Sequence, residues 1–111
     1  MTELEDKQCL PCEGGVDPLS VETSDKLVSQ VPGWKTNDER TAIRRELEFK
    51  DFYRTMSFVN AVAHVANCEN HHPDLEVGYN YCRITFTTHA IGGLSENDFI
   101  CAAKINRFAD T

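Results

Sequence analysis

The stretch from Asp51 to about Asn67 constrains the fold more than any other, because it predicts a long amphipathic helix. Asp51, or the residue before it, places a negative charge at the positive end of the helix dipole. Two apolar stripes recur at helical spacing. One must pack on a sheet, and the second predicts either an oligomer contact or a further helix buried beneath this one. The first stripe is Phe52, Met56, Val59, Ala63 and Ala66, and the second is Phe58, Val62 and Val65.

The segments on both sides of this helix predict strands. Residues 34–36 and 43–49 read as a hairpin that turns over residues 37–39, with Ile43, Leu47 and Phe49 on one face of its second strand. After the helix, apolar and polar residues alternate over residues 75–79 and again over residues 82–88. This period of two predicts another strand pair, with a tight turn at residues 79–80.

Two shorter helices complete the pattern. Thr23 or Ser24 is expected to cap a helix that runs through residue 31, where a Pro-Gly pair stops it. Ser95 is expected to cap the last helix, because Asp98 holds the acidic position of a capping box. The order helix, two strands, helix, two strands, helix predicts an α+β domain. Its three helices pack on one face of a four-stranded antiparallel sheet.

Composition limits the partners of this domain. The 111 residues suffice for a single core, and the net charge of −7 argues against nucleic acid as a partner. No apolar run approaches membrane-spanning length, and the first residues lack the basic start of a signal peptide. Five cysteines, an odd number, fit a reducing compartment better than a disulfide framework. These features predict a cytoplasmic protein without a membrane partner.

Residues 1–18 are expected to form a flexible N-terminal tail, and residues 19–111 to form the domain. Cys9 and Cys12 have C-x-x-C spacing inside this tail. A zinc site would need a second pair, and a redox site would need the motif to open a helix. Neither condition is met, so the motif predicts no function.

Three of the four histidines fall in one neighbourhood: His71, His72 and His89. Pro73 disfavours the α conformation at His72, so residues 70–74 read as a corner between helix and strand. If the two following strands pair antiparallel, His89 returns beside the other two histidines. Imidazole both gives and takes protons near neutral pH, so convergence would predict an acid–base site. Surface or hydrogen-bonded core histidines are the alternative interpretation. A shared metal ion is disfavoured, because adjacent side chains on an extended segment diverge.

The motif resembles a family signature. His71-His72-Pro73, then Tyr79, His89, Gly93-Leu94-Ser95 and Asp98, resembles the pterin-4a-carbinolamine dehydratases over residues 34–108. The resemblance implies a four-stranded sheet backed by three helices, a homodimer or homotetramer, and no metal or other cofactor. It implies dehydration of a 4a-hydroxytetrahydropterin to quinonoid dihydropterin, the step that recycles tetrahydrobiopterin for aromatic amino acid hydroxylases. Such a hydroxylase is the partner that the resemblance suggests.

The resemblance also assigns roles to residues. It implies that His71, His72 and His89 are catalytic, and we expect His71 and His89 to transfer protons while His72 holds the pterin. Asn67 stands where the family usually has an acidic residue, Lys or His. A non-catalytic pterin-binding protein, or a dimerisation or coactivator module, is the alternative function. The expected pocket residues besides the histidines are Asn70, Pro73, Thr87, Thr88 and Ala90, and the expected orienting residues are Asp98 and Glu69.

Overall fold

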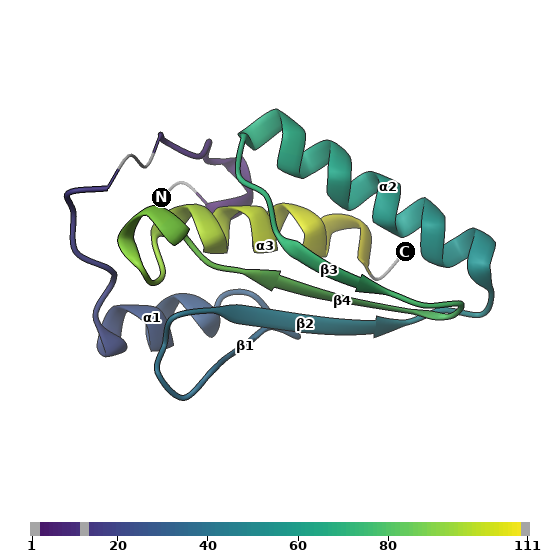
Figure 1. Ribbon diagram of the computed structural model, residues 1–111, viewed down its shortest axis with the longest axis horizontal. Coiled ribbons are helices and arrows are strands. Elements are labelled where there is room, and N and C mark those ends of the chain that lie inside the picture. The colour runs from purple at the N-terminus through teal and green to yellow at the C-terminus, as the bar shows by residue number, and fades with distance from the viewer. Residues whose placement is uncertain (1–2, 12–13, 110–111) are drawn as a thin grey trace.

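A computed structural model describes residues 3–11 and 14–109 as a four-stranded antiparallel sheet in contact with three α-helices (Figure 1). The strand order is β1-β2-β4-β3, so β3 lies at an edge of the sheet. This confirms the predicted α+β fold class. The elements are the 3₁₀ helices η1 (Leu4–Asp6) and η2 (His89–Ile91), the helices α1 (Val21–Val28), α2 (Phe52–Glu69) and α3 (Glu96–Ala109), and the strands β1 (Lys35–Thr36), β2 (Ile43–Glu48), β3 (Asp74–Val77) and β4 (Tyr81–Phe86).

The core lies between the sheet and the helices. Strand β4 alternates as the sequence predicts, because Cys82, Ile84 and Phe86 are all fully buried. On α3, Phe99 and Ile105 are fully buried against them. Figure 1 shows α2 and α3 running side by side against the sheet, while α1 lies at the β1 and β2 side. Among the described residues, no helix has both the length and the apolar character needed to cross a membrane.

The fold decides which stripe of α2 is buried. Phe58 and Val62, from the second stripe, belong to the core, whereas Phe52 at the head of the first stripe is 48% exposed. Phe58 lies between two aromatic rings, with centroids 5.2 Å from Phe49 and 5.6 Å from Phe108. The interpretation of the second stripe as an oligomer contact is therefore wrong. Two aromatic residues, Phe49 just after β2 and Phe108 on α3, select this side of the helix.

The helix starts agree with the sequence at α2 and differ at α1. Asp51 caps α2 as predicted, because its side chain accepts a hydrogen bond from the backbone N–H of Arg54 at 2.9 Å. Helix α1 begins three residues earlier than expected, since Ser20 is its cap and accepts from the backbone N–H of Thr23 at 3.1 Å. Ser24 is fully buried within the helix, so the expectation that Thr23 or Ser24 caps it is wrong.

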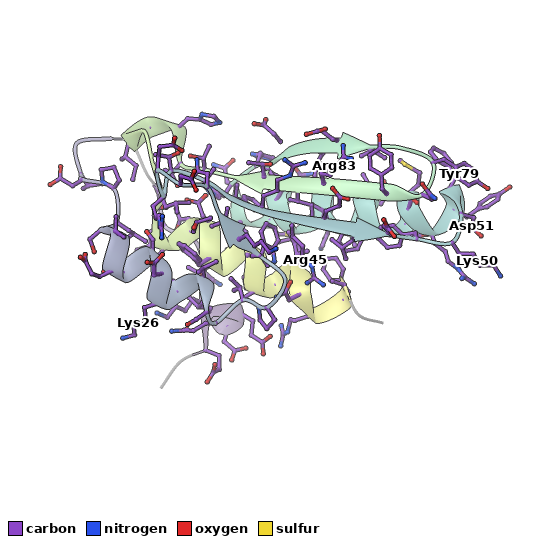
Figure 2. The ribbon with its side chains drawn as sticks, turned by 90° about the horizontal axis from the view of Figure 1, so that it is seen from below. Lys26, Arg45, Lys50, Asp51, Tyr79 and Arg83 are labelled. Carbon is purple, nitrogen blue, oxygen red and sulfur yellow. The ribbon has the colours of Figure 1, made fainter. Side chains whose placement is uncertain are left out.

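The end of the molecule that holds the β3–β4 turn is tied to the start of α2. Thr55 is fully buried, and its hydroxyl donates to the carbonyl oxygen of Tyr79 at 2.9 Å. Figure 2 shows Asp51 and Tyr79 together at this end. Arg83 lies on the outer face of the sheet, where it pairs with Glu46 at 2.6 Å and Glu76 at 3.2 Å. Both features are remote from the histidine corner.

The described part of the predicted tail packs on the domain. Leu4 is only 7% exposed and joins the core, and Lys104 of α3 donates to the carbonyl oxygen of Glu5 at 3.0 Å. Further along, the backbone N–H of Leu19 donates to the carbonyl oxygen of Leu94 at 2.9 Å. The division into a tail and a domain stays a prediction, but residues 3–11 run along α3 with defined contacts.

Candidate active site

The histidine corner forms because the sequence ends α2 sharply. Asn70 adopts the left-handed conformation, with φ 50° and ψ 42°, which asparagine tolerates better than most residues. The backbone N–H of His71 then donates to the carbonyl oxygen of Ala66 at 3.1 Å and satisfies one of the last helical carbonyls. Pro73 follows, and β3 begins at the next residue. This is the predicted corner between helix and strand.

The strand register brings the third histidine back to this corner. Asp74 lies opposite Thr85 in the antiparallel β3–β4 pair, so the chain beyond Phe86 returns toward His71 and His72. All three histidines line one pocket of about 510 Å³. Pro73 is outside the lining. The other expected pocket residues are in it: Asn70, Thr87, Thr88 and Ala90.

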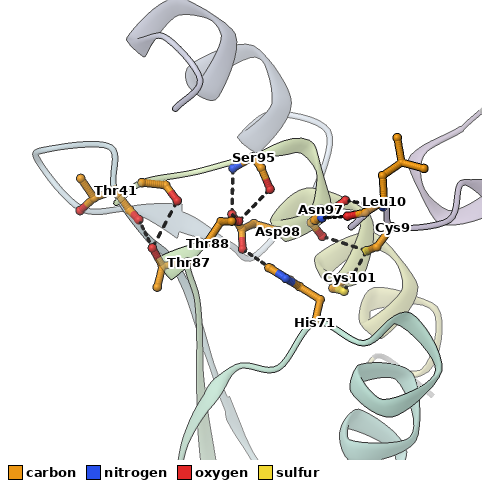
Figure 3. A network of polar contacts seen from close by, with 11 residues as sticks. Cys9, Leu10, Thr41, His71, Thr87, Thr88, Ser95, Asn97, Asp98 and Cys101 are labelled. Atoms are coloured by element: carbon orange, nitrogen blue, oxygen red, sulfur yellow. Dashed lines mark hydrogen bonds and ion pairs between the residues drawn. The ribbon is translucent and has the colours of Figure 1, made fainter. Parts of the chain in front are cut away.

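His71 is held by a buried carboxylate. Its Nε2 lies 2.6 Å from Oδ1 of Asp98, which is fully buried in the first turn of α3 (Figure 3). The other oxygen of Asp98 accepts from the backbone N–H of Ser95 at 3.0 Å, the acidic half of the predicted capping box. It also accepts from the Thr88 hydroxyl at 2.8 Å. Both carboxylate oxygens are therefore acceptors, which places a proton on Nε2 of His71 and leaves its Nδ1 free for proton transfer.

Packing fixes the same imidazole from a second direction. The ring of His71 stacks on that of Phe86, with centroids 5.7 Å apart and planes 5° from parallel. The Thr88 hydroxyl lies 2.7 Å from the Ser95 hydroxyl, so Ser95 can donate to it while it donates to Asp98. A strand, a helix start and a corner thus converge on one ring. Such support holds a reacting group in a single geometry.

The other two histidines have different surroundings. His72 is exposed, and its Nε2 lies 3.1 Å from the side-chain oxygen of Asn67. Asn67 therefore contacts the site at the position where the family usually has an acidic residue, Lys or His. His89 is exposed on η2, and its ring has no hydrogen-bond partner among residues 3–11 and 14–109. His71 is thus rigidly held, while His89 is free to meet a ligand.

Glu69, the other expected orienting residue, lines the pocket, but its side chain accepts a hydrogen bond from the backbone N–H of Cys9 at 2.7 Å and makes none to a histidine in the described chain. Cys9 is one of four lining residues that the sequence analysis did not predict. No sequence signal could have found this contact, since every residue except proline has the same backbone N–H. The missed residues are Cys9, Leu10, Pro11 and Asn97.

The pocket offers acid–base chemistry. Two imidazoles with different surroundings, one oriented by a carboxylate and one free, can give and take protons on a small substrate bound in the same pocket. Among the described residues, no group of three or more histidine, cysteine, aspartate or glutamate side chains could hold a metal ion. The fold and site define a class of α+β protein with a histidine acid–base pocket at a sheet corner.

Comparison with known proteins identifies the family within this class. Residues 17–108 match the family model described as pterin 4 alpha carbinolamine dehydratase. The chain belongs to this family, as the histidine motif indicated.

Similar proteins cover nearly the whole chain. A Nitrosomonas eutropha protein named "Putative pterin-4-alpha-carbinolamine dehydratase" is 58% identical over 105 residues, 94% of this chain and 91% of that one. A protein of the same name from Legionella pneumophila strain Corby is 52% identical over 107 residues, 96% of this chain and 95% of that one. A crystal structure from Brucella melitensis, titled as a transcriptional coactivator/pterin dehydratase, has a TM-score of 0.79 at 32% identity, covering 84% of this chain and 99% of that one.

Proposed function

We propose that this protein dehydrates a 4a-hydroxytetrahydropterin to quinonoid dihydropterin and water. Membership of the dehydratase family supports the reaction. The observation that carries the site assignment is the convergence of His71, His72 and His89 on one pocket, with His71 held by buried Asp98.

The reaction needs one proton delivered and one removed. An acid protonates the hydroxyl on C4a, the C4a–O bond breaks, and water leaves. A base takes the proton from N5, and the N5–H electrons form the C4a=N5 double bond. Each proton transfer by a positioned side chain contributes roughly 10²–10⁴-fold to the rate. Afterwards acid and base regain their starting states by exchange with solvent, so substrate is converted to product and water without a further reactant.

The surroundings of the histidines suggest how these roles divide. His71 keeps one nitrogen on Asp98 and has the other for proton transfer, so Asp98 acts as a positioning residue. His89 is exposed at the pocket wall and serves as the second proton-transfer group. His72, hydrogen-bonded to Asn67 at 3.1 Å, holds the pterin ring or its hydroxyl.

A stopped-flow assay of 4a-hydroxypterin dehydration with alanine variants tests these roles. We expect His71→Ala and His89→Ala each to lower kcat roughly 10²-fold or more, the range for loss of an acid or base. His72→Ala should act mainly through KM, because its contact with substrate is shared by ground and transition states. His64→Ala is the matched control, since this exposed α2 histidine lies outside the pocket. If all three pocket variants retain the wild-type rate, the protein is a binding module and the proposal is wrong.

The cellular role follows from the same reaction. We propose that the protein recycles tetrahydrobiopterin in the cytoplasm, with an aromatic amino acid hydroxylase as the source of its substrate. Four cysteines in the described residues are free, which suits a reducing compartment: Cys9, Cys68, Cys82 and Cys101.

We also propose that the protein is a homodimer or homotetramer, and that its copies meet at a sheet edge, as the family resemblance implies, and not through the second apolar stripe of α2. Strand β3 is an edge strand, and an unpaired edge offers its backbone groups to another chain. Leu75 and Val77 on this strand are 37% and 40% exposed, and Tyr79 beside it is 64% exposed. Edge pairing between two copies would cover them.

A coactivator or dimerisation module is the second candidate function. The Brucella melitensis relative carries both activities in its title, and the exposed β3 edge provides a surface for a protein partner. The histidine assay separates the two candidates, because a module of this kind would not need proton transfer.

A further inference from the structure

Residues 7–11, here called the N-terminal strap, lie outside the matched family segment, which begins at residue 17. They nevertheless form part of the pocket wall, through Cys9, Leu10 and Pro11. At most four residues of this chain lie outside the alignment with the Legionella relative, so that alignment extends into the strap. The Legionella relative thus has residues that align with the strap.

The strap is held by residues adjacent to the site. The side-chain amide of Asn97 makes two hydrogen bonds to Leu10, accepting from its backbone N–H at 3.0 Å and donating to its carbonyl oxygen at 2.7 Å (Figure 3). Asn97 is only 8% exposed and immediately precedes Asp98, the partner of His71. Glu69 accepts from Cys9 at 2.7 Å and immediately precedes the histidine corner. Both anchors therefore couple the strap to the elements that carry the histidines.

Other strap contacts are weaker or serve a different purpose. The ion pair of Lys7 with Glu96, at 3.0 Å, is largely exposed, and such pairs contribute little. The thiols of Cys9 and Cys101 lie 3.6 Å apart, which reports the close approach of strap and helix. The paired bonds of Asn97 are the stronger constraint, because they are partly buried and fix both backbone groups of one residue.

The wall that the strap provides is apolar and uncovered. Leu10 is 74% exposed although its backbone is anchored at both polar groups. The same pocket is lined by histidines and threonines, whose polar groups suit the edge of a pterin but not its ring face. An anchored leucine at the mouth of a small-molecule pocket gains most of its burial when a ligand arrives.

We infer that the strap is a specificity-determining wall of the substrate pocket, with Leu10 covering the pterin and Asn97 as the positioning residue that docks it. This inference rests on the proposed function. It requires that changes in the strap alter pterin affinity and KM while leaving the chemistry at the histidines unchanged.

Binding and kinetics of point variants in the full chain test the wall. The probe is 7,8-dihydrobiopterin, which lacks the 4a-hydroxyl and is not turned over, titrated by calorimetry beside the dehydration assay. Leu10→Ala should raise both Kd and KM roughly ten-fold, as expected for loss of a leucine-sized apolar contact, with kcat within two-fold. Val16→Ala is the matched control, because Val16 is 62% exposed in the same N-terminal stretch but outside the pocket lining.

Asn97 variants test the docking. Asn97→Ala should raise Kd at least as much as Leu10→Ala, whereas Asn97→Asp keeps the acceptor for the Leu10 N–H and should give an intermediate Kd. Aspartate is also favourable in the first turn of a helix, so this variant should fold even if the alanine variant does not. An intermediate Kd with unchanged kcat would not result from a general loss of structure.

Disulfide mapping tests whether the strap is docked against α3 when no ligand is bound. Mild oxidation by diamide takes two protons and two electrons from a pair of thiols, which become one disulfide while diamide becomes its hydrazine. Cys101 is fully buried, so docking is read from the ratio of products: docking should raise the share of the Cys9–Cys101 disulfide relative to Cys9–Cys12, which joins residues three apart in sequence. Asn97→Ala should shift the products toward Cys9–Cys12.

Three results would overturn the inference. One is a Kd and KM for Leu10→Ala and Asn97→Asp within two-fold of wild type. Another is an Asn97→Ala variant that yields the Cys9–Cys101 and Cys9–Cys12 disulfides in the wild-type ratio. Either leaves the dehydratase proposal standing. A wild-type protein that neither binds pterin nor dehydrates substrate would overturn both proposals together.

Discussion

Replacing Asp98 by asparagine isolates the positioning of His71. Asp98 is fully buried and accepts from Nε2 of His71 at 2.6 Å, from the Thr88 hydroxyl at 2.8 Å and from the Ser95 N–H at 3.0 Å. Asparagine has one acceptor oxygen, which we expect to stay with Thr88 and Ser95. Its amide N–H₂ group then faces the protonated Nε2 of His71, so two hydrogen-bond donors point at each other.

The cost can be worked out from these contacts. A hydrogen bond to a charged group contributes about 1.5–3 kcal/mol and a neutral one about 0.5–1.5 kcal/mol, so replacing the carboxylate by an amide should cost Asp98→Asn roughly 2 kcal/mol of folding free energy. In a domain of this size that lowers Tm by roughly 8–16 °C, and the variant remains folded at room temperature. Asp98→Ala is less useful, because it strands three donors at once.

The catalytic effect should exceed the effect on stability. To accept from the new amide, His71 must move its proton from Nε2 to Nδ1, the nitrogen that the mechanism needs free. We expect kcat to fall roughly 10²-fold, the range for loss of a general acid or base, with KM within about three-fold.

The assay combines stopped-flow kinetics below Tm with ¹⁵N NMR of the His71 ring, which reports which nitrogen is protonated. Asp74→Asn is the control, since Asp74 is exposed at the start of β3, close to the histidine corner. If Asp98→Asn keeps kcat within three-fold and the ring keeps its proton on Nε2, Asp98 is only a helix cap.

Two further predictions concern the core and the edge. Burial raises the pKa of Cys82 from 9.0 to about 11, so the unfolded chain ionises this thiol first and stability should decline between pH 9 and 11, by up to about 1.4 kcal/mol per pH unit. Urea midpoints at pH 8 and pH 10 should show a smaller decline for Cys82→Ala, and an equal decline would contradict the assignment. Val62→Asp should unfold the protein, because Val62 is fully buried, whereas Val77→Asp should only dissociate oligomers in analytical ultracentrifugation. A wild-type protein that sediments as a monomer at micromolar concentration would rule out the edge contact.

Local sequence determined the elements that build the site. The cap at Asp51, the Pro73 that follows the two histidines and the alternation along β4 each depend on residues a few positions apart, so their physics is visible without a fold. Antiparallel pairing of β3 and β4 then follows from a short connection, and it returns His89 to His71. Asp98 was visible in the sequence both as a capping residue and as an expected orienting residue, but only the geometry shows that the imidazole it contacts is that of His71.

Only the tertiary structure decided the side of α2 that is buried and the place of the N-terminal strap. Both stripes of α2 are apolar, so periodicity cannot choose between them, and the neighbouring rings of Phe49 and Phe108 do. The strap has no periodicity, and Leu10 meets Asn97 87 positions along the chain through backbone groups common to nearly all residues. Such a contact leaves no pattern in the sequence, because what selects it is the position of α3 and not the identity of the residues around it.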